Sequence, residues 1–210
     1  MPTDYLWMAP AGAALLGYLL GSIPFGVILT SLSGAGDLRQ IGSGNIGATN
    51  VLRTGRKGLA AATLLLDAAK GFAAVWLARH FFGGQDDSIA VIAAAAAFLG
   101  HLYPIWLRFH GGKGVATLMG IVLALHWPCA LVYAVVWLGL LGLLRISSVA
   151  GMAAAISAPV SAAFFSAFDI VLLLLALALL VLWKHRENID RLLSGTEPRI
   201  GAKKPAEPDA

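Results

Sequence analysis

The sequence predicts an all-α integral membrane protein with about seven transmembrane helices. The 210 residues are 59% hydrophobic and only 12% charged, with a mean hydropathy of +0.80. A soluble domain is usually about 45–50% apolar and about 25% charged. Apolar runs also alternate with short polar breaks, and Lys and Arg gather in every second break. Since one crossing takes about 20 apolar residues, the length holds about seven spans and no separate soluble domain.

The apolar runs give the expected spans in order. The first run is long enough to tilt or to pass the membrane surface, and the fourth is short for a crossing. Trp127-Pro128 suits a tight turn, because proline starts a helix well but cannot continue one. The expected spans cover about residues 5–33, 59–80, 89–107, 114–127, 129–145, 149–167 and 169–184.

The basic residues predict the orientation. One set of breaks carries thirteen of them, and the other set carries only Arg79 together with four Asp residues. By the positive-inside rule the first set is cytoplasmic, which places the N-terminus outside and the C-terminus inside. We expect residues 1–197 to form one membrane domain and residues 198–210, which are polar, to form a disordered cytoplasmic tail. The thirteen are Arg39, Arg53, Arg56, Lys57, Arg108, Lys113, Arg145, Lys184, Arg186, Arg191, Arg199, Lys203 and Lys204.

One basic residue, Lys70, falls inside a predicted span. Asp67 precedes it by three residues, so both side chains lie on one helix face. Charged groups inside spans usually face the protein interior in pairs. We interpret Asp67 and Lys70 as a structural ion pair near a helix end rather than as catalytic groups.

Two glycine-rich polar segments predict phosphate binding. Residues 36–58 combine Gly, Ser, Thr and Asn with Arg39, Arg53 and Arg56, and residues 100–117 contain Gly-Gly-Lys113-Gly before the fourth span. Glycine lets backbone N–H groups converge on an anion, and Arg or Lys adds charge. The spacing Gly42-x-Gly44-x-x-Gly47 matches a dinucleotide fingerprint, but we reject it because no β-α-β unit surrounds it.

Two further polar segments follow. Arg145, Ile146, Ser147 and Ser148 mark a turn, where serine is typically a helix cap. After the last span, His185, Asn188 and Arg191 recur every three residues and so share one polar helix face. His185 and Asp190 also show an H-x4-D spacing, but on one helix they project about 140° apart, which is poor for a catalytic dyad.

The four segments together resemble the bacterial acyl-phosphate:glycerol-3-phosphate acyltransferase family, PlsY. The resemblance covers nearly the whole chain and rests on GSIPFG at 21–26, GSGNIGATN at 42–50 with Arg53, GGKGVAT at 111–117, and HRENI at 185–189 with Arg191. One position departs: Gly151 stands where some relatives carry a second serine, so that role passes to Ser148.

The resemblance implies transfer of an acyl group from acyl phosphate to the 1-hydroxyl of sn-glycerol 3-phosphate, the first step of phospholipid synthesis, at the cytoplasmic face of the bacterial inner membrane. The implied partners are these two substrates, membrane lipid and the enzyme that supplies acyl phosphate. We expect no cofactor, metal or nucleic acid. The implied catalytic residues are Ser43, Lys113, His185 and Asn188, and the implied substrate-binding residues are Asn45, Thr49, Asn50, Arg53, Gly112, Gly114, Ser148 and Arg191.

Two questions stay open at this point. Either the phosphate of the substrate or His185, whose free pKa near 6.5 suits the task, takes the proton of the hydroxyl. The competing class is a transporter of a phosphorylated solute, which predicts polar groups near the middle of the membrane and an internal repeat. The sequence carries no convincing repeat.

Overall fold

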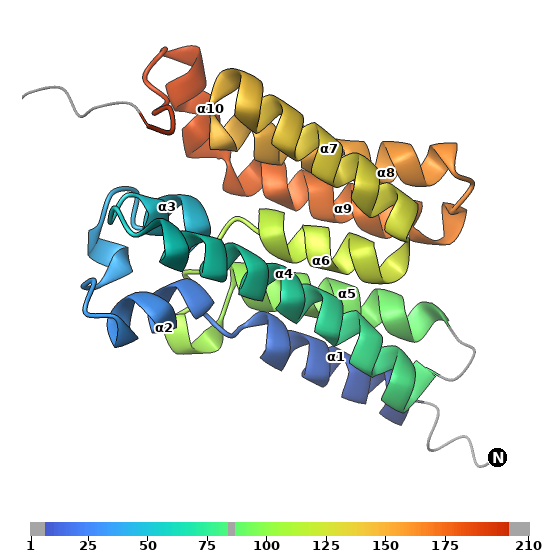
Figure 1. The fold of residues 1–210 in the computed structure, drawn as a ribbon. Helices are drawn as coiled ribbons and strands as arrows, with labels where there is room; N and C mark the ends of the chain where they lie inside the picture. Colours follow the sequence, from blue (N-terminus) through green and yellow to red (C-terminus); the bar gives the residue numbers. More distant parts are fainter. Residues whose placement is uncertain (1–6, 84–86, 202–210) are drawn as a thin grey trace, which may run out of the picture.

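The computed structural model describes residues 7–83 and 87–201, and the regular elements of this part are all helical (Figure 1). This confirms the predicted fold class. Short turns η2 (Leu38–Gln40), η3 (Arg79–Gly83) and η4 (Ile105–Leu107) join or extend the helices. The helices are α1 (Met8–Gly21), α2 (Phe25–Leu32), α3 (Ala48–Leu52), α4 (Lys57–Ala78), α5 (Asp87–Leu102), α6 (Val115–Leu125), α7 (Trp127–Leu144), α8 (Ser147–Phe164), α9 (Phe168–Lys184) and α10 (Arg186–Leu193).

Five stretches of the described chain are long and apolar enough to cross a membrane. The bent pair α9–α10, with an angle of 57° between its helices, would make a sixth. Large apolar side chains such as Leu65, Val160 and Leu172 point outward, as expected where lipid is the solvent. The 11 residues of α6 extend only about 16 Å, which is short of the roughly 30 Å apolar layer. The fourth predicted segment is therefore a short helix, whereas the first is divided between α1 and α2.

The division between α1 and α2 lies at Ser22–Pro24, where proline cannot continue the hydrogen-bond ladder. Side chains from elsewhere satisfy the carbonyl groups that the break releases. Trp106 donates its indole N–H to the Ser22 carbonyl, and Lys70 Nζ donates to the Ile23 carbonyl at 2.8 Å. The break therefore costs no unpaired backbone group at these positions, which an apolar medium would penalise by several kcal/mol (~2–7).

Asp67 and Lys70 form the predicted ion pair, with Oδ1 and Nζ 2.7 Å apart and both side chains buried. The sequence suggested a position near a helix end, but the pair lies in the middle of α4. His101 of α5 stands beside it, with Nδ1 3.8 Å from Asp67 Oδ1. One charged cluster thus joins α4, α5 and the break between α1 and α2.

Small residues allow the helices to approach closely. A Cβ at Gly21 of α1 would lie 1.9 Å from the Ala97 carbonyl oxygen of α5. A Cβ at Gly120 of α6 would lie 1.8 Å from the Ala68 carbonyl oxygen of α4. Lipid supplies little hydrophobic drive for association between helices, so contacts of this kind carry much of the packing energy.

The polar segments collect at one end of the bundle. Figure 1 shows α2, α3, α10 and the chain before α6 at this end, whereas α1 begins and α4 ends at the other. Beyond the expected boundary at residue 197, the Ile200 N–H donates to the Arg145 carbonyl at 2.7 Å. The remainder of the predicted tail, residues 202–210, lies outside the described residues.

Replacing Gly120 with alanine should destabilise the fold, because the new methyl group meets backbone of α4 rather than a mobile side chain. Overpacking of this kind typically costs about 1–3 kcal/mol, more than the roughly 0.5–1 kcal/mol gained from helix propensity. Thermal unfolding in detergent should show a Tm several degrees lower. Gly139→Ala on α7, where a Cβ meets nothing within 4 Å, is the matched control. Equal Tm values for the two variants would contradict the close α4–α6 contact.

Candidate active site

The loop between α2 and α3 is organised around the buried side chain of Asn50. Its Nδ2 group faces the carbonyl oxygens of Leu38, Ile41 and Asn45 at 3.1, 2.8 and 2.8 Å, and its Oδ1 accepts from the Ser43 N–H at 3.2 Å. An amide nitrogen has only two hydrogens, so these contacts use its full donor capacity. The Asn50 side chain thus holds the loop in shape, and its role in substrate binding stays a prediction.

Glycines 42 and 44 give this loop its curvature. Their φ angles are +56° and +68°, a region that side chains with a Cβ rarely adopt. A Cβ at Gly42 would also lie 2.7 Å from the side chain of Arg53, so Arg53 lies directly over the loop. Asn45 Oδ1 accepts the Gly47 N–H at 2.9 Å just before α3, whereas Ser43 and Thr49 are exposed. The candidate donors Ser43, Thr49 and Arg53 are therefore on the accessible side of the loop.

Lys113 is presented by a second loop that rests on α5. The N–H groups of Gly111 and Gly112 donate to the carbonyls of Leu102 and His101, each at 3.1 Å. A Cβ at Gly112 would lie 2.2 Å from His101 Nε2, and one at Gly114 would lie 2.4 Å from the ring of Phe98. Gly112 and Gly114 therefore allow close contact with α5, and Lys113 between them extends toward α10.

The bend between α9 and α10 places His185 and Asn188. His185 is buried, and its Nδ1 lies 2.8 Å from the Val181 carbonyl oxygen, so Nδ1 carries the proton and donates. Burial lowers the pKa of His185 to about 4, which leaves the ring neutral at pH 7. Asp190, by contrast, is exposed, in keeping with the rejection of a His185–Asp190 dyad.

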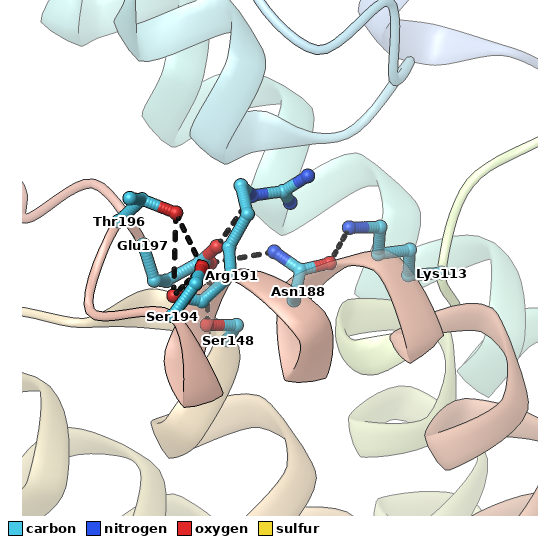
Figure 2. A network of polar contacts seen from close by, with 7 residues as sticks. All are labelled: Lys113, Ser148, Asn188, Arg191, Ser194, Thr196 and Glu197. Atoms are coloured by element: carbon cyan, nitrogen blue, oxygen red, sulfur yellow. Dashed lines mark hydrogen bonds and ion pairs between the residues drawn. The ribbon is translucent and has the colours of Figure 1, made fainter.

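A carboxylate, Glu197, joins residues from two separate helices, α8 and α10 (Figure 2). Its Oε1 accepts from Ser148 Oγ of α8 and from Asn188 Nδ2 of α10, each at 2.6 Å, and its Oε2 accepts from Arg191 Nε at 2.8 Å. The other end of the Asn188 amide, Oδ1, accepts a hydrogen bond from Lys113 Nζ. Four residues predicted from the sequence, Lys113, Ser148, Asn188 and Arg191, therefore belong to one network.

The charges of this network are strongly coupled. The pKa of Lys113 is lowered to about 8, mainly by burial and also by the charges of Arg191 and Arg53, whereas Glu197 and Glu187 oppose the shift. For Glu197, burial acts to raise the pKa, but the hydrogen bonds from Ser148, Asn188 and Arg191 together hold it below its usual value. At neutral pH the site thus holds a lysine ammonium that is easily deprotonated beside a firmly ionised carboxylate.

Sequence reasoning missed Glu197. The predicted residues fall into two groups at the same end of the bundle, the network around Glu197 with His185 beside it and the loop around Asn50. The influence of Arg53 on the pKa of Lys113 connects the two groups. The sequence offered little signal, because Glu197 is one of several acidic residues, with Glu187 and Asp190, among the cations that follow the last span.

Comparison with known proteins shows the family of the chain. Residues 11–195 match the family model described as glycerol-3-phosphate acyltransferase. The chain belongs to this family. A glycerol-3-phosphate acyltransferase of Mesorhizobium japonicum is 58% identical over 191 residues, covering 91% of this chain and 96% of the relative. Another, from Caulobacter vibrioides, is 57% identical over 198 residues, covering 93% of this chain and 90% of the relative.

A solved structure is similar over the same length. The crystal structure of PlsY, an integral membrane glycerol 3-phosphate acyltransferase, in its glycerol 3-phosphate form is 40% identical, with a TM-score of 0.84 and coverage of 91% of this chain and 96% of that one. Its lysophosphatidic acid form gives a TM-score of 0.82 at 38% identity over 91% of this chain and 95% of that one. The predicted family, the acyltransferase class and the integral membrane fold are thereby confirmed.

Replacing Asn50 with aspartate should loosen the loop, because an oxygen would then face three carbonyl oxygens where Nδ2 now donates. An unpaired, repelled carboxylate at this buried position should cost several kcal/mol locally (~3–5). Tryptic cleavage in detergent at Arg39 and Arg53 should accelerate at least tenfold. Asn45→Asp, which keeps the oxygen that accepts from Gly47, is the matched control. Equal cleavage rates would show that Asn50 does not hold the loop.

Proposed function

We propose that the protein transfers an acyl group from acyl phosphate to the 1-hydroxyl of sn-glycerol 3-phosphate, giving lysophosphatidic acid and inorganic phosphate. The network that joins Lys113, Ser148, Asn188 and Arg191 at one end of an apolar helix bundle carries the proposal. Membership of the glycerol-3-phosphate acyltransferase family supports the acceptor. The glycerol 3-phosphate and lysophosphatidic acid forms of the similar PlsY structure support the acceptor and the product.

The division of the site into two groups supports a reaction between two phosphate-bearing substrates. We assign the phosphate of the acyl donor to Lys113 and to the exposed side of the glycine-rich loop, with Ser43, Asn45 and Thr49. We assign the binding of glycerol 3-phosphate to Arg53, Ser148, His185, Asn188 and Arg191. Arg53 and Arg191 can bind phosphate through two parallel hydrogen bonds, which fixes orientation as well as adding energy. Gly112 and Gly114 contribute by keeping Lys113 in place.

The reaction then needs little covalent help from the protein. The glycerol oxygen attacks the acyl carbonyl carbon, the bond from that carbon to the phosphate oxygen breaks, and inorganic phosphate leaves. Lys113 as an ammonium stabilises the charge that develops on the leaving phosphate, and the remaining groups supply orientation. The hydroxyl proton passes to a phosphate oxygen, whose second pKa is about 6. His185 is a poor base in this arrangement, because its pKa is about 4.

The membrane setting follows from charge. The end of the bundle that carries the site is also the end rich in Lys and Arg, which by the positive-inside rule faces the cytoplasm. We therefore place the protein in the inner membrane of a bacterium with its site open to the cytoplasm, within reach of the enzyme that supplies acyl phosphate. The apolar spans offer the acyl chain a path into the bilayer. A solute transporter would instead concentrate polar groups near mid-membrane.

The proposal is tested with purified protein, glycerol 3-phosphate and palmitoyl phosphate in detergent or lipid. We expect inorganic phosphate and lysophosphatidic acid to appear in equal amounts, and Lys113→Ala and Arg53→Ala to lower the rate at least about 100-fold, because each removes a charge-assisted contact to phosphate. Lys57→Ala, at the exposed start of α4, is the control.

Other outcomes would overturn the proposal in distinct ways. Product from acyl-CoA or acyl-carrier protein, but not from acyl phosphate, would keep the acyltransferase and change the donor. No product with any donor, together with uptake of labelled glycerol 3-phosphate into sealed vesicles, would favour the transporter.

His185→Gln should keep turnover within roughly tenfold of wild type at saturating substrate, because it removes one neutral hydrogen-bonding group and no base. The glutamine amide can still donate to the Val181 carbonyl. Steady-state rates at saturating substrate from pH 5 to 9 provide the measurement. A loss of 100-fold or more in kcat, together with loss of an ionisation near pH 6.5, would instead make His185 the base.

A further inference from the structure

Glu197 is an acidic side chain placed among the groups that the proposed function gives to an anionic substrate. Its side chain is only 5% exposed, and it accepts hydrogen bonds from Ser148, Asn188 and Arg191 at 2.6–2.8 Å. These three donors come from α8 and α10, which do not adjoin in sequence. A single carboxylate therefore fixes the relative positions of three binding residues.

The contact with Asn188 also determines which way that amide faces. An ionised carboxylate can only accept hydrogen bonds, so the NH2 group of Asn188 must point to Glu197. The amide oxygen is then turned toward Lys113, whose ammonium can only donate. Glu197, Asn188 and Lys113 thus form a chain in which every donor meets an acceptor, and the carboxylate sets its direction.

The contact with Arg191 leaves part of that side chain available. Glu197 is bonded to Nε. The two terminal nitrogens have no hydrogen bond within residues 7–83 and 87–201, and in Figure 2 they point away from the carboxylate. Glu197 therefore fixes the Arg191 side chain through Nε, and the two terminal nitrogens of Arg191 can still bind a phosphate.

The segment that delivers Glu197 is firmly tied. The N–H groups of Thr196 and Glu197 donate to the Arg191 carbonyl at 2.8 and 3.1 Å, and Gly195 allows the reversal with a φ of +70°. Beyond Glu197, the Ile200 N–H donates to the Arg145 carbonyl at the turn before α8. The chain after α10 is thus folded back onto the α7–α8 turn, and Glu197 lies between.

We propose that Glu197 is a positioning residue of the acyltransferase, which aligns Ser148, Asn188 and Arg191 for glycerol 3-phosphate and, through Asn188, orients Lys113. This inference rests on the proposed function. The rival reading is an internal anion that occupies the place of a substrate phosphate and must be displaced. The backbone bonds on both sides of Glu197 and the free terminal nitrogens of Arg191 favour positioning. The two readings predict opposite effects of removing the carboxylate.

The charges around Lys113 give a second, independent readout. Arg53 from the end of α3 and Arg191 from α10 lower the pKa of Lys113, whereas Glu187 from α10 and Glu197 raise it, and neutral His185 lies nearby. Removing the charge of Glu197 lowers the pKa of Lys113 below its value of about 8. The ammonium is then lost at lower pH, so the alkaline limb of the rate profile should move to lower pH.

The experiment compares Glu197→Gln, Glu197→Asp and, as control, Asp190→Asn, which removes a carboxylate from the exposed face of α10. All are assayed from pH 6 to 10 with glycerol 3-phosphate and palmitoyl phosphate, and Tm is recorded. For Glu197→Gln we expect kcat/KM to fall roughly 10- to 100-fold with a raised KM for glycerol 3-phosphate, the equivalent of one lost charged hydrogen bond. The alkaline limb should shift to lower pH. Glu197→Asp should recover part of both effects, and Asp190→Asn should match wild type.

Three results would overturn the inference. A lower KM or higher kcat/KM in Glu197→Gln would identify a displaced internal anion. Wild-type kinetics in Glu197→Gln would show that the carboxylate has no part in the reaction. A loss of rate with an unmoved alkaline limb, no recovery in Glu197→Asp and a lowered Tm would reduce Glu197 to a structural contact. Wild type is assayed in parallel, so an inactive wild type refutes the proposed function itself, and this inference with it.

Discussion

The buried ion pair between Asp67 and Lys70 is the interaction on which the arrangement of the site end depends. Lys70 bonds both Asp67 and the carbonyl released at the break between α1 and α2, and His101 stands against Asp67. His101 in turn supports the loop that carries Lys113, since its carbonyl accepts the Gly112 N–H. Removing one partner of a buried pair typically costs about 3–5 kcal/mol, because the other charge is left uncompensated. The direction of α2 and the position of Lys113 thus both depend on the Asp67–Lys70 pair.

Much of the fold follows from composition and charge. Seven apolar runs predict helices at the right places, because a chain in lipid must satisfy its backbone internally. The division of the first run into α1 and α2 was not predicted, although Pro24 lies within the run. A break there is tolerated because the distant side chains of Trp106 and Lys70 donate to the carbonyls that it releases. The fourth run is short for a crossing in the sequence, and the structure ends α6 after 11 residues. A hydropathy average describes one segment of the sequence and contains no information on contacts with distant residues.

The site was predictable as a set of segments but not as a geometry. Lys113, Ser148, Asn188 and Arg191 come from three of the four segments singled out in the sequence, and the structure brings them into one network. Asn50 was given to substrate binding through the family resemblance, and the structure shows its side chain buried and bonded within its own loop. Glu197 was overlooked because it belongs to the chain after α10, where a turn ending in Glu-Pro resembles the start of a polar tail. Both side chains are buried, and sequence patterns do not report burial.

A carboxylate in a site for anions answers a problem that cations alone create. Arg53, Lys113 and Arg191 would face two phosphate groups, each carrying about −1.5 to −2 charges, and inorganic phosphate must leave after every cycle. Binding substrate, transition state and product equally tightly lowers KM without accelerating the chemical step. Glu197 takes up one donor from each of three side chains, so those side chains meet a phosphate with fewer free donors but in fixed directions. The site thereby binds phosphate less tightly but orients it better. Attack by the weakly nucleophilic hydroxyl on the reactive acyl donor requires this orientation.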